Sequence, residues 1–205
     1  MNFDFSDDQK LLKEQVRKFL ADKCPTKVVR RVLDGNETHA EDVWKGLVDL
    51  GVPGIGIPEE YGGSGLSPLE VCVVAEEIGR AAAPVPFDTS VVLATEALKL
   101  AGSDAQKKKW LPQCATGEIV CAYALTEPGS GSDAGAMKTL GVYDAEKRAW
   151  ILNGRKQWIT NGGYANLVTV FARTPVTLDG ETKEKITCFM VDRGLPGFGS
   201  GPPEK

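Results

Sequence analysis

The sequence predicts an α+β protein, in which an N-terminal all-α helical domain is followed by an antiparallel β-barrel-like domain. Residues 1–117 carry apolar side chains at helical spacing between capping signals. Residues 118–205 carry short segments rich in β-branched and aromatic residues. Runs of helices followed by runs of strands are typical of the α+β class. We therefore place the two domains at 1–117 and 118–205.

The first helix is predicted by a capping signal and an apolar stripe. Ser6, with Gln9 three residues later, forms a capping box that satisfies two free backbone N–H groups. The stripe that follows consists of Leu12, Val16, Phe19 and Leu20. A second, short helix is predicted around Trp44 and Leu47, and Gly51 ends it.

A third helix is predicted from Pro68 to about Gly79, because proline suits the first turn of a helix. The segment AAAPVPF, residues 81–87, then breaks the helix, since its prolines fix φ and remove backbone donors. We interpret this break as a connection between helices.

Two more helices are predicted before residue 118. The fourth covers Thr89–Leu100. Ser103 with Gln106 repeats the capping box and opens the fifth, which Pro112 should kink or terminate.

Six short strands are predicted in the second half. They are Val120–Leu125, Leu140–Tyr143, Trp150–Leu152, Gln157–Thr160, Leu167–Ala172 and Ile186–Val191. Asn153-Gly154 between the third and the fourth is a hairpin turn signal.

Composition excludes several classes of function. A net charge of -4 gives no basic footprint for nucleic acid. No apolar run approaches the roughly 20 residues of a membrane span. The five cysteines show no C-x-x-C spacing and the N-terminus is acidic, so we expect a cytoplasmic protein without a signal or transit peptide. His39 is the only histidine, which argues against a Ser-His-Asp triad and a multi-histidine metal site.

The segment YALTEPGSGSD, residues 123–133, concentrates hydroxyls, glycines and carboxylates in one turn behind a predicted strand. Its glycines lack the βαβ context of a Rossmann dinucleotide site. They still permit close backbone approach, and Ser130 and Ser132 add donors suited to phosphate oxygens. From the residues alone, a ligand-binding turn and a plain loop between strands both stay open.

A second segment, WITNGG at 158–163, adds an indole and a hydroxyl. Trp158 and Thr160 stand two apart on a predicted strand, so we expect both on one face. An indole can lie against a planar ring, and a hydroxyl can hydrogen-bond a ring nitrogen or oxygen. An ordinary half-buried strand would favour the same residues.

Together, YALTEPGSGSD and WITNGG, in this order after an all-helical half, resemble the acyl-CoA dehydrogenase family. Three further stretches agree with the family pattern: LGVPGIGIPEEYGGSGLS, AGSDAQKKKWLPQCATGE and FMVDRGLPGF. The resemblance covers essentially the whole chain. It departs at Ser130, where alanine is common in the family.

The resemblance implies an FAD-dependent enzyme of fatty acid metabolism that oxidises an acyl-CoA thioester to its 2,3-enoyl form. In such enzymes a glutamate removes the α-proton while the β-hydrogen leaves as hydride to flavin N5. The implied cofactor-binding residues are Tyr123, Leu125, Thr126, Gly131, Ser132, Trp158, Ile159 and Thr160. Ser132 is also implied to bind the CoA part of the substrate, and the Thr160 hydroxyl to lie close to N5.

No catalytic residue is expected within the 205 residues, because the resemblance assigns the base to a later helical domain. Glu127 and Asp133 should instead make local turn or capping hydrogen bonds. The chain ends at GSGPPEK where relatives continue, so we expect an incomplete or partner-dependent part of a dehydrogenase, inactive alone.

Two alternatives stay open: a non-catalytic FAD- and CoA-binding subunit of a heteromeric dehydrogenase, and an acyl-CoA oxidase. The expected partners are the acyl-CoA substrate, an electron-transferring flavoprotein, and other subunits in a homo- or hetero-oligomer. A homotetramer is usual in the family.

Overall fold

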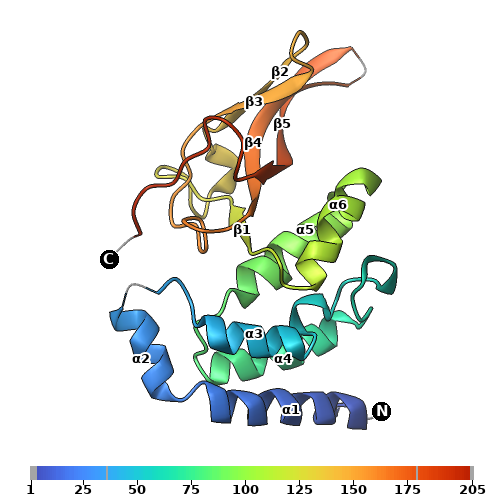
Figure 1. Cartoon of the computed structure of the whole chain (residues 1–205). Helices are drawn as coiled ribbons and strands as arrows, with labels where there is room; N and C mark the ends of the chain where they lie inside the picture. Colours follow the sequence, from blue (N-terminus) through green and yellow to red (C-terminus); the bar gives the residue numbers. More distant parts are fainter. Residues whose placement is uncertain (1–3, 36, 179, 204–205) are drawn as a thin grey trace. The chain divides into compact units, whose positions relative to one another are not determined.

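The chain divides into two compact units, Met1–Val120 and Cys121–Lys205. The computed structural model describes residues 4–35, 37–178 and 180–203 (Figure 1). The first unit is helical and the second contains the β-sheet.

Among the residues that the structure describes, six α-helices form most of the first unit. They are α1 Asp7–Lys23, α2 Thr26–Asp34, α3 Glu41–Asp49, α4 Pro68–Arg80, α5 Thr95–Ala101 and α6 Asp104–Ala115. A π-helix, Asp88–Ala94, leads directly into α5. The 3-10 turns Val52–Gly54 and Glu59–Tyr61 follow α3. The predicted capping boxes at Ser6 and Ser103 are confirmed, since in each the serine and the glutamine bond each other's backbone.

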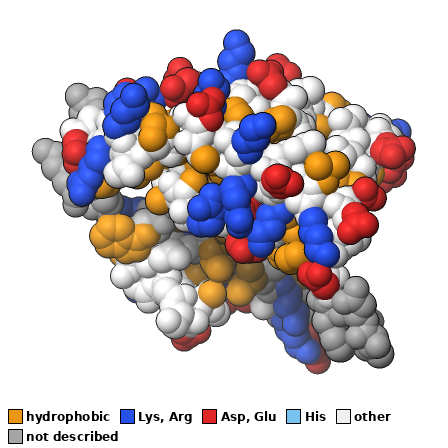
Figure 2. Space-filling model, turned by 90° about the horizontal axis from the view of Figure 1, so that it is seen from below, with side chains coloured by type: hydrophobic (Ala, Val, Ile, Leu, Met, Phe, Trp, Pro, Cys, Tyr) orange, Lys and Arg blue, Asp and Glu red, His pale blue; other side chains and the backbone are white. Residues whose placement is uncertain are grey.

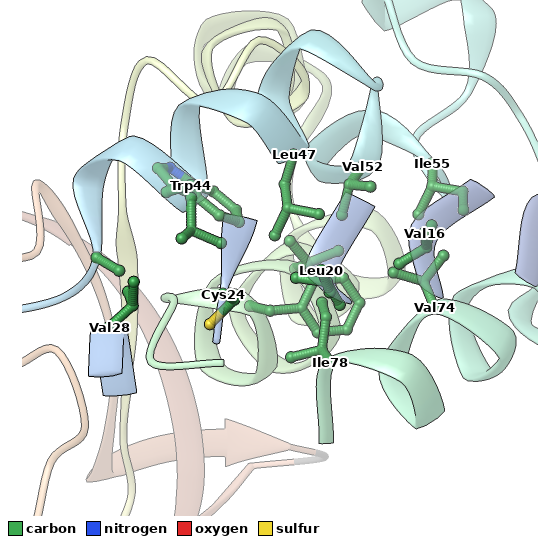
Figure 3. Packing of buried hydrophobic residues seen from close by; sticks show 14 residues of the cluster. Val16, Leu20, Cys24, Val28, Trp44, Leu47, Val52, Ile55, Val74 and Ile78 are labelled. Atoms are coloured by element: carbon green, nitrogen blue, oxygen red, sulfur yellow. The ribbon is translucent and has the colours of Figure 1, made fainter. Parts of the chain in front are cut away.

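The core of this unit is formed where α1, α3 and α4 meet (Figure 3). Leu20 and Leu47 are fully buried at its centre, and Val16 and Val74 pack beside them. The residues of the predicted α1 stripe therefore face the core, as their spacing requires.

The helical predictions are wrong in three places. Helix α2 was not predicted, because it buries only Val28 and its valines also suit a strand. The predicted fourth helix begins as a π-helix, in which the Thr95 N–H bonds the Ser90 carbonyl five residues back. Helix α6 does not terminate at Pro112 but continues to Ala115, and the alternative of a kink there stays a prediction. The last residues of α6 follow the proline, whose missing N–H leaves one helical hydrogen bond unmade.

Helices α1 and α4 are also joined by a buried carboxylate. Glu77 on α4 is fully buried and accepts from the Arg17 guanidinium at 2.7 and 2.9 Å. Arg80 Nε donates to the same carboxylate at 2.9 Å. These hydrogen bonds, led by the one from Arg17, outweigh burial and lower the pKa of Glu77 to about 2.

The molecular face in Figure 2 carries basic, acidic and apolar side chains intermixed.

The second unit is built on a five-stranded sheet. Its strands are β1 Cys121–Ala124, β2 Leu140–Asp144, β3 Ala149–Asn153, β4 Leu167–Leu178 and β5 Glu181–Asp192. Strands β4 and β5 pair antiparallel along their whole length. Strand β1 runs parallel to the start of β4, and β2 pairs parallel with β4 at Leu140 and Arg173. Strands β2 and β3 form an antiparallel hairpin.

Four predictions for this unit need correction. The sheet is mixed rather than antiparallel, because β1 and β2 both run parallel to β4. Over the residues that the structure describes, it does not close into a barrel. Residues 157–160 form a loop instead of a strand, and Asn153-Gly154 ends β3 rather than turning a hairpin.

Within the described ranges, no helix has the length and apolarity to cross a membrane. No cluster of three or more His, Cys, Asp or Glu side chains suited to a metal ion occurs among the same residues.

Candidate cofactor site

The sequence-predicted cofactor residues all lie in the second unit. Tyr123 lies on β1, and its ring packs on Phe171 of β4 with centroids 5.0 Å apart. Burial raises the pKa of the Tyr123 phenol, so the ring remains neutral at ordinary pH. Leu125 and Thr126 follow directly where β1 ends, and both are half-buried. The strand therefore fixes where the turn starts.

Residues 121–127 and 156–161 lie side by side, joined by hydrogen bonds. Gln157 N donates to the Thr126 carbonyl at 3.0 Å. Asn161 Nδ2 donates to the Cys121 carbonyl at 3.1 Å. The starts of the two segments of the sequence signature are thus held together in space.

The turn after β1 is closed by its own backbone and by Ser130. Glu127 and Ser130 exchange backbone hydrogen bonds of 2.9 and 3.1 Å. The Ser130 hydroxyl donates to the Asp133 carbonyl at 2.7 Å. Ser130 is buried, so its hydroxyl needs such a partner. The departure from alanine at this position therefore adds a bond across the turn.

The Glu127 carboxylate has a larger role than the local turn contact that we predicted. It accepts from the backbone N–H groups of Lys138 at 2.6 Å and Thr139 at 2.9 Å, and from the Thr139 hydroxyl. Lys156 Nζ forms an ion pair with it at 2.8 Å. Burial alone would raise the pKa of Glu127, but these donors outweigh burial and lower it to about 2.

Trp158 stands out in its backbone and in its exposure. Its φ is +59°, a left-handed conformation that costs a bulky residue on the order of 1–3 kcal/mol. Its side chain is 64% exposed, so packing within the unit does not compensate that cost. Strain of this kind, held by surrounding contacts, is concentrated at binding and catalytic sites. Because the segment is not a strand, alternation along a strand does not place Trp158 and Thr160 on one face.

The turn that follows Trp158 is held from two sides. Tyr164 donates its hydroxyl to Asn161 Oδ1 at 2.7 Å, and burial raises the pKa of Tyr164 to about 12. The Arg193 guanidinium donates to the carbonyls of Gly162, Gly163 and Ala165. Three backbone oxygens on one guanidinium leave the turn little freedom.

The glycines of the site have room beside them. A Cβ added at Gly129, Gly131 or Gly163 would meet no atom within 4 Å, and none of the three has a positive φ. The fold therefore does not require glycine at these positions, whereas close approach of a flat or phosphorylated ligand would. Exposed hydroxyls on Ser132 and Thr160 lie in the same two segments. This donor set and the open backbone fit a dinucleotide such as FAD.

The structure thus holds Leu125 and Thr126 beside residues 156–157, leaves Gly131, Ser132 and Thr160 exposed, and packs Ile159 against the apolar cluster of the sheet. Their contact with a cofactor stays a prediction.

Sequence reasoning missed Lys156, Asn161 and Arg193 as supports of the site. Asn161 offered a signal, since asparagine tolerates the left-handed φ of +64° found there. Lys156 offered none, because its partner Glu127 lies far away in the sequence.

Comparison with known proteins identifies relatives along the whole chain. The family models "Acyl-CoA dehydrogenase, N-terminal domain" and "Acyl-CoA dehydrogenase, middle domain" match residues 6–118 and 122–205. The human mitochondrial very long-chain specific acyl-CoA dehydrogenase is 43% identical over 176 residues, covering 84% of this chain and 27% of the relative. Mitochondrial isovaleryl-CoA dehydrogenase of Pongo abelii is 39% identical over 197 residues, covering 94% and 45%.

A solved structure shows the same fold. The acyl-CoA dehydrogenase of Bacillus anthracis, complexed with FAD, superimposes with a TM-score of 0.86 at 36% identity, covering 98% of this chain and 33% of that one. The chain thus spans less than half the length of these three proteins. With both family models matching in chain order, the chain belongs to the acyl-CoA dehydrogenase family.

Proposed function

We propose that the chain supplies the N-terminal and middle parts of an FAD-dependent acyl-CoA dehydrogenase, which converts an acyl-CoA to its 2,3-enoyl-CoA. The observation that carries this proposal is the pairing of residues 121–127 with 156–161 through Gln157, beside exposed Trp158 and open glycines. FAD, when bound, supplies the hydride acceptor. In this chain Thr126, Ser132, Trp158 and Thr160 would hold it.

Neither acidic residue of the signature suits the role of the base. The Glu127 carboxylate is buried, ionised and already bound by four donors. A base must reach the substrate proton and have a pKa near the working pH, and a pKa of about 2 is far below it. Asp133 is exposed in the turn. The family resemblance assigns the α-proton base to a later helical domain, so the base lies outside residues 1–205 in this proposal.

The first test is cofactor binding. The protein, freed of flavin, is titrated with FAD while flavin fluorescence and visible absorption are recorded. We expect binding at micromolar or lower FAD, and at least tenfold weaker binding for Trp158→Gly. Glycine accepts the left-handed φ, so this variant should fold with unchanged or higher stability. Wild-type protein that binds no FAD would contradict the proposal.

The second test is turnover by the full-length protein, with acyl-CoA substrates from isovaleryl to very long-chain. Flavin bleaching under argon and an enoyl-CoA product identified by mass would support a dehydrogenase. Re-oxidation by an electron-transferring flavoprotein, rather than rapid consumption of oxygen, would separate it from an oxidase. FAD binding without turnover of any substrate would instead indicate a non-catalytic subunit.

A further inference from the structure

A largely buried ion pair joins the two segments of the candidate site, 121–127 and 156–161. The Lys156 side chain is 11% exposed and the Glu127 side chain 5%. Their atoms Nζ and Oε1 are 2.8 Å apart. Desolvation of two charges costs several kcal/mol per ion before their attraction offsets it. A pair of this kind is therefore weak evidence for stability and raises the question of what else it does.

The contacts of Lys156 show that it holds the backbone of the neighbouring segment in place. Its ammonium group also donates to the Leu125 carbonyl at 3.0 Å. It thus binds the residues on both sides of Thr126, whose own carbonyl accepts from Gln157 N. Three successive residues, 125–127, are thereby fixed to two successive residues, 156 and 157.

The carboxylate extends this connection to a third segment. The Glu127 carboxylate accepts hydrogen bonds from the backbone N–H groups of Lys138 and Thr139 and from the Thr139 hydroxyl, just before β2 begins. Those donors would already satisfy most of a carboxylate's hydrogen-bonding capacity. The ammonium group of Lys156 is what links the carboxylate to the loop that carries Trp158.

We propose that Lys156 and Glu127 are positioning residues, which set the register of residues 125–127 against 156–158 so that Thr126 and Trp158 can contact one ligand. The inference rests on the proposed FAD function. A buried polar group that specifies register at some expense of stability is known in other folds. Here the pair is expected to act through Leu125, Thr126 and Trp158, without touching the cofactor.

The test compares Lys156→Met with a matched control, Arg17→Met, in the full-length protein. Both variants remove one cation from a buried carboxylate that keeps other donors, but Arg17 lies in the helical unit. Hydrogen exchange is measured without flavin, at peptides covering 125–127 and 156–161. We expect at least tenfold faster exchange at Gln157 N–H in Lys156→Met and less than twofold change there in Arg17→Met. Equal changes in both variants would overturn the proposal.

Cofactor binding gives a second readout, by FAD titration and the visible circular dichroism of the bound flavin. Lys156→Met should weaken FAD binding at least tenfold and alter the flavin spectrum, while Arg17→Met changes neither. If wild-type protein binds no FAD but Gln157 still responds as expected, the proposed function fails and the register role stands. Unchanged exchange with normal FAD binding overturns the register role alone.

A double variant, Lys156→Met with Glu127→Gln, separates the loss of register from a general loss of folding stability. It removes both charges but leaves the new amide NH2 facing a backbone N–H, so stability should recover only in part relative to Lys156→Met. The Leu125 carbonyl still lacks its donor, so exchange at Gln157 and FAD binding should remain impaired. Full recovery of all three measurements would show that the pair only balances charge, and would overturn the proposal.

Discussion

Glu77 in the helical unit and Glu127 in the sheet unit are both buried carboxylates with a pKa of about 2, yet their partners differ. Glu77 is held by two arginines whose side chains are 47% and 49% exposed. Glu127 is held by backbone N–H groups and by a lysine whose side chain is only 11% exposed. The first joins two helices through side chains that water can reach. The second joins three segments at the candidate site through partners that are much less exposed to water.

The largest expected effect tests that difference directly. Glu127→Met leaves the largely buried ammonium group of Lys156 without its carboxylate partner, so we expect a loss of about 3–5 kcal/mol of unfolding free energy. Glu77→Met frees Arg17 and Arg80, which can be hydrated in place, so we expect a loss of about 1–2 kcal/mol. Urea titration read by hydrogen exchange measures each unit separately. Equal losses would show that exposure of the partners does not decide the cost.

The second prediction concerns acid. Both folded pKa values lie below the ordinary value of 4.5, so each carboxylate stabilises its unit fully above about pH 4.5. That stabilisation, on the order of 3 kcal/mol each, is lost as the pH falls toward 2. Denaturation midpoints between pH 6 and pH 2 measure it. Glu77→Gln should flatten the curve of the helical unit and leave that of the sheet unit unchanged.

A smaller effect is expected at the turn beyond Trp158. Tyr164→Phe removes the bond to Asn161 Oδ1 and should cost about 1 kcal/mol. The stability that Tyr164 contributes should also depend on pH, because its pKa is about 12 in the folded protein and near the ordinary value of 10 in the unfolded chain. The stabilisation is thus present below pH 10 and lost as the pH rises toward 12. Tyr164→Phe should lack this alkaline loss in ultraviolet titration coupled to unfolding.

The smallest effect is expected at Ser130. Ser130→Ala removes one hydrogen bond to the exposed Asp133, whose carbonyl water can then reach, and should cost about 0.5 kcal/mol. FAD affinity should stay within twofold of wild type. A tenfold loss would show that the hydroxyl itself touches the ligand.

Local chemistry made the helical unit largely predictable. The capping boxes at Ser6 and Ser103 depend on residues three apart, so the sequence displays them fully. Much of the sheet depends on distant partners instead. The parallel pairing of β1 with β4 joins residues that lie on either side of the candidate site in the sequence, and no local sequence pattern predicts it.

The loop at 157–160 shows the same limit within the site. Trp, Ile and Thr favour a strand, but the bonds of Gln157 and Asn161 to the β1 region hold the segment in another conformation. The signature residues could be named from the sequence. Their supports, Lys156 and Arg193, could not, since each acts on carbonyls about 30 positions away.

The shared edge of β4 has a consequence for how such a site could change over time. Because β5 occupies one edge of β4 throughout, β1 and β2 must follow one another along the other edge, at Val170 and then Arg173. Three residues of strand span about 10 Å, so all of residues 125–139 bridge that short gap. The two strands are in effect one interrupted strand with the signature turn as an insert. Such an insert can be lengthened, shortened or exchanged while the sheet beneath keeps its pairing, so the turn is a natural unit for transplantation between relatives.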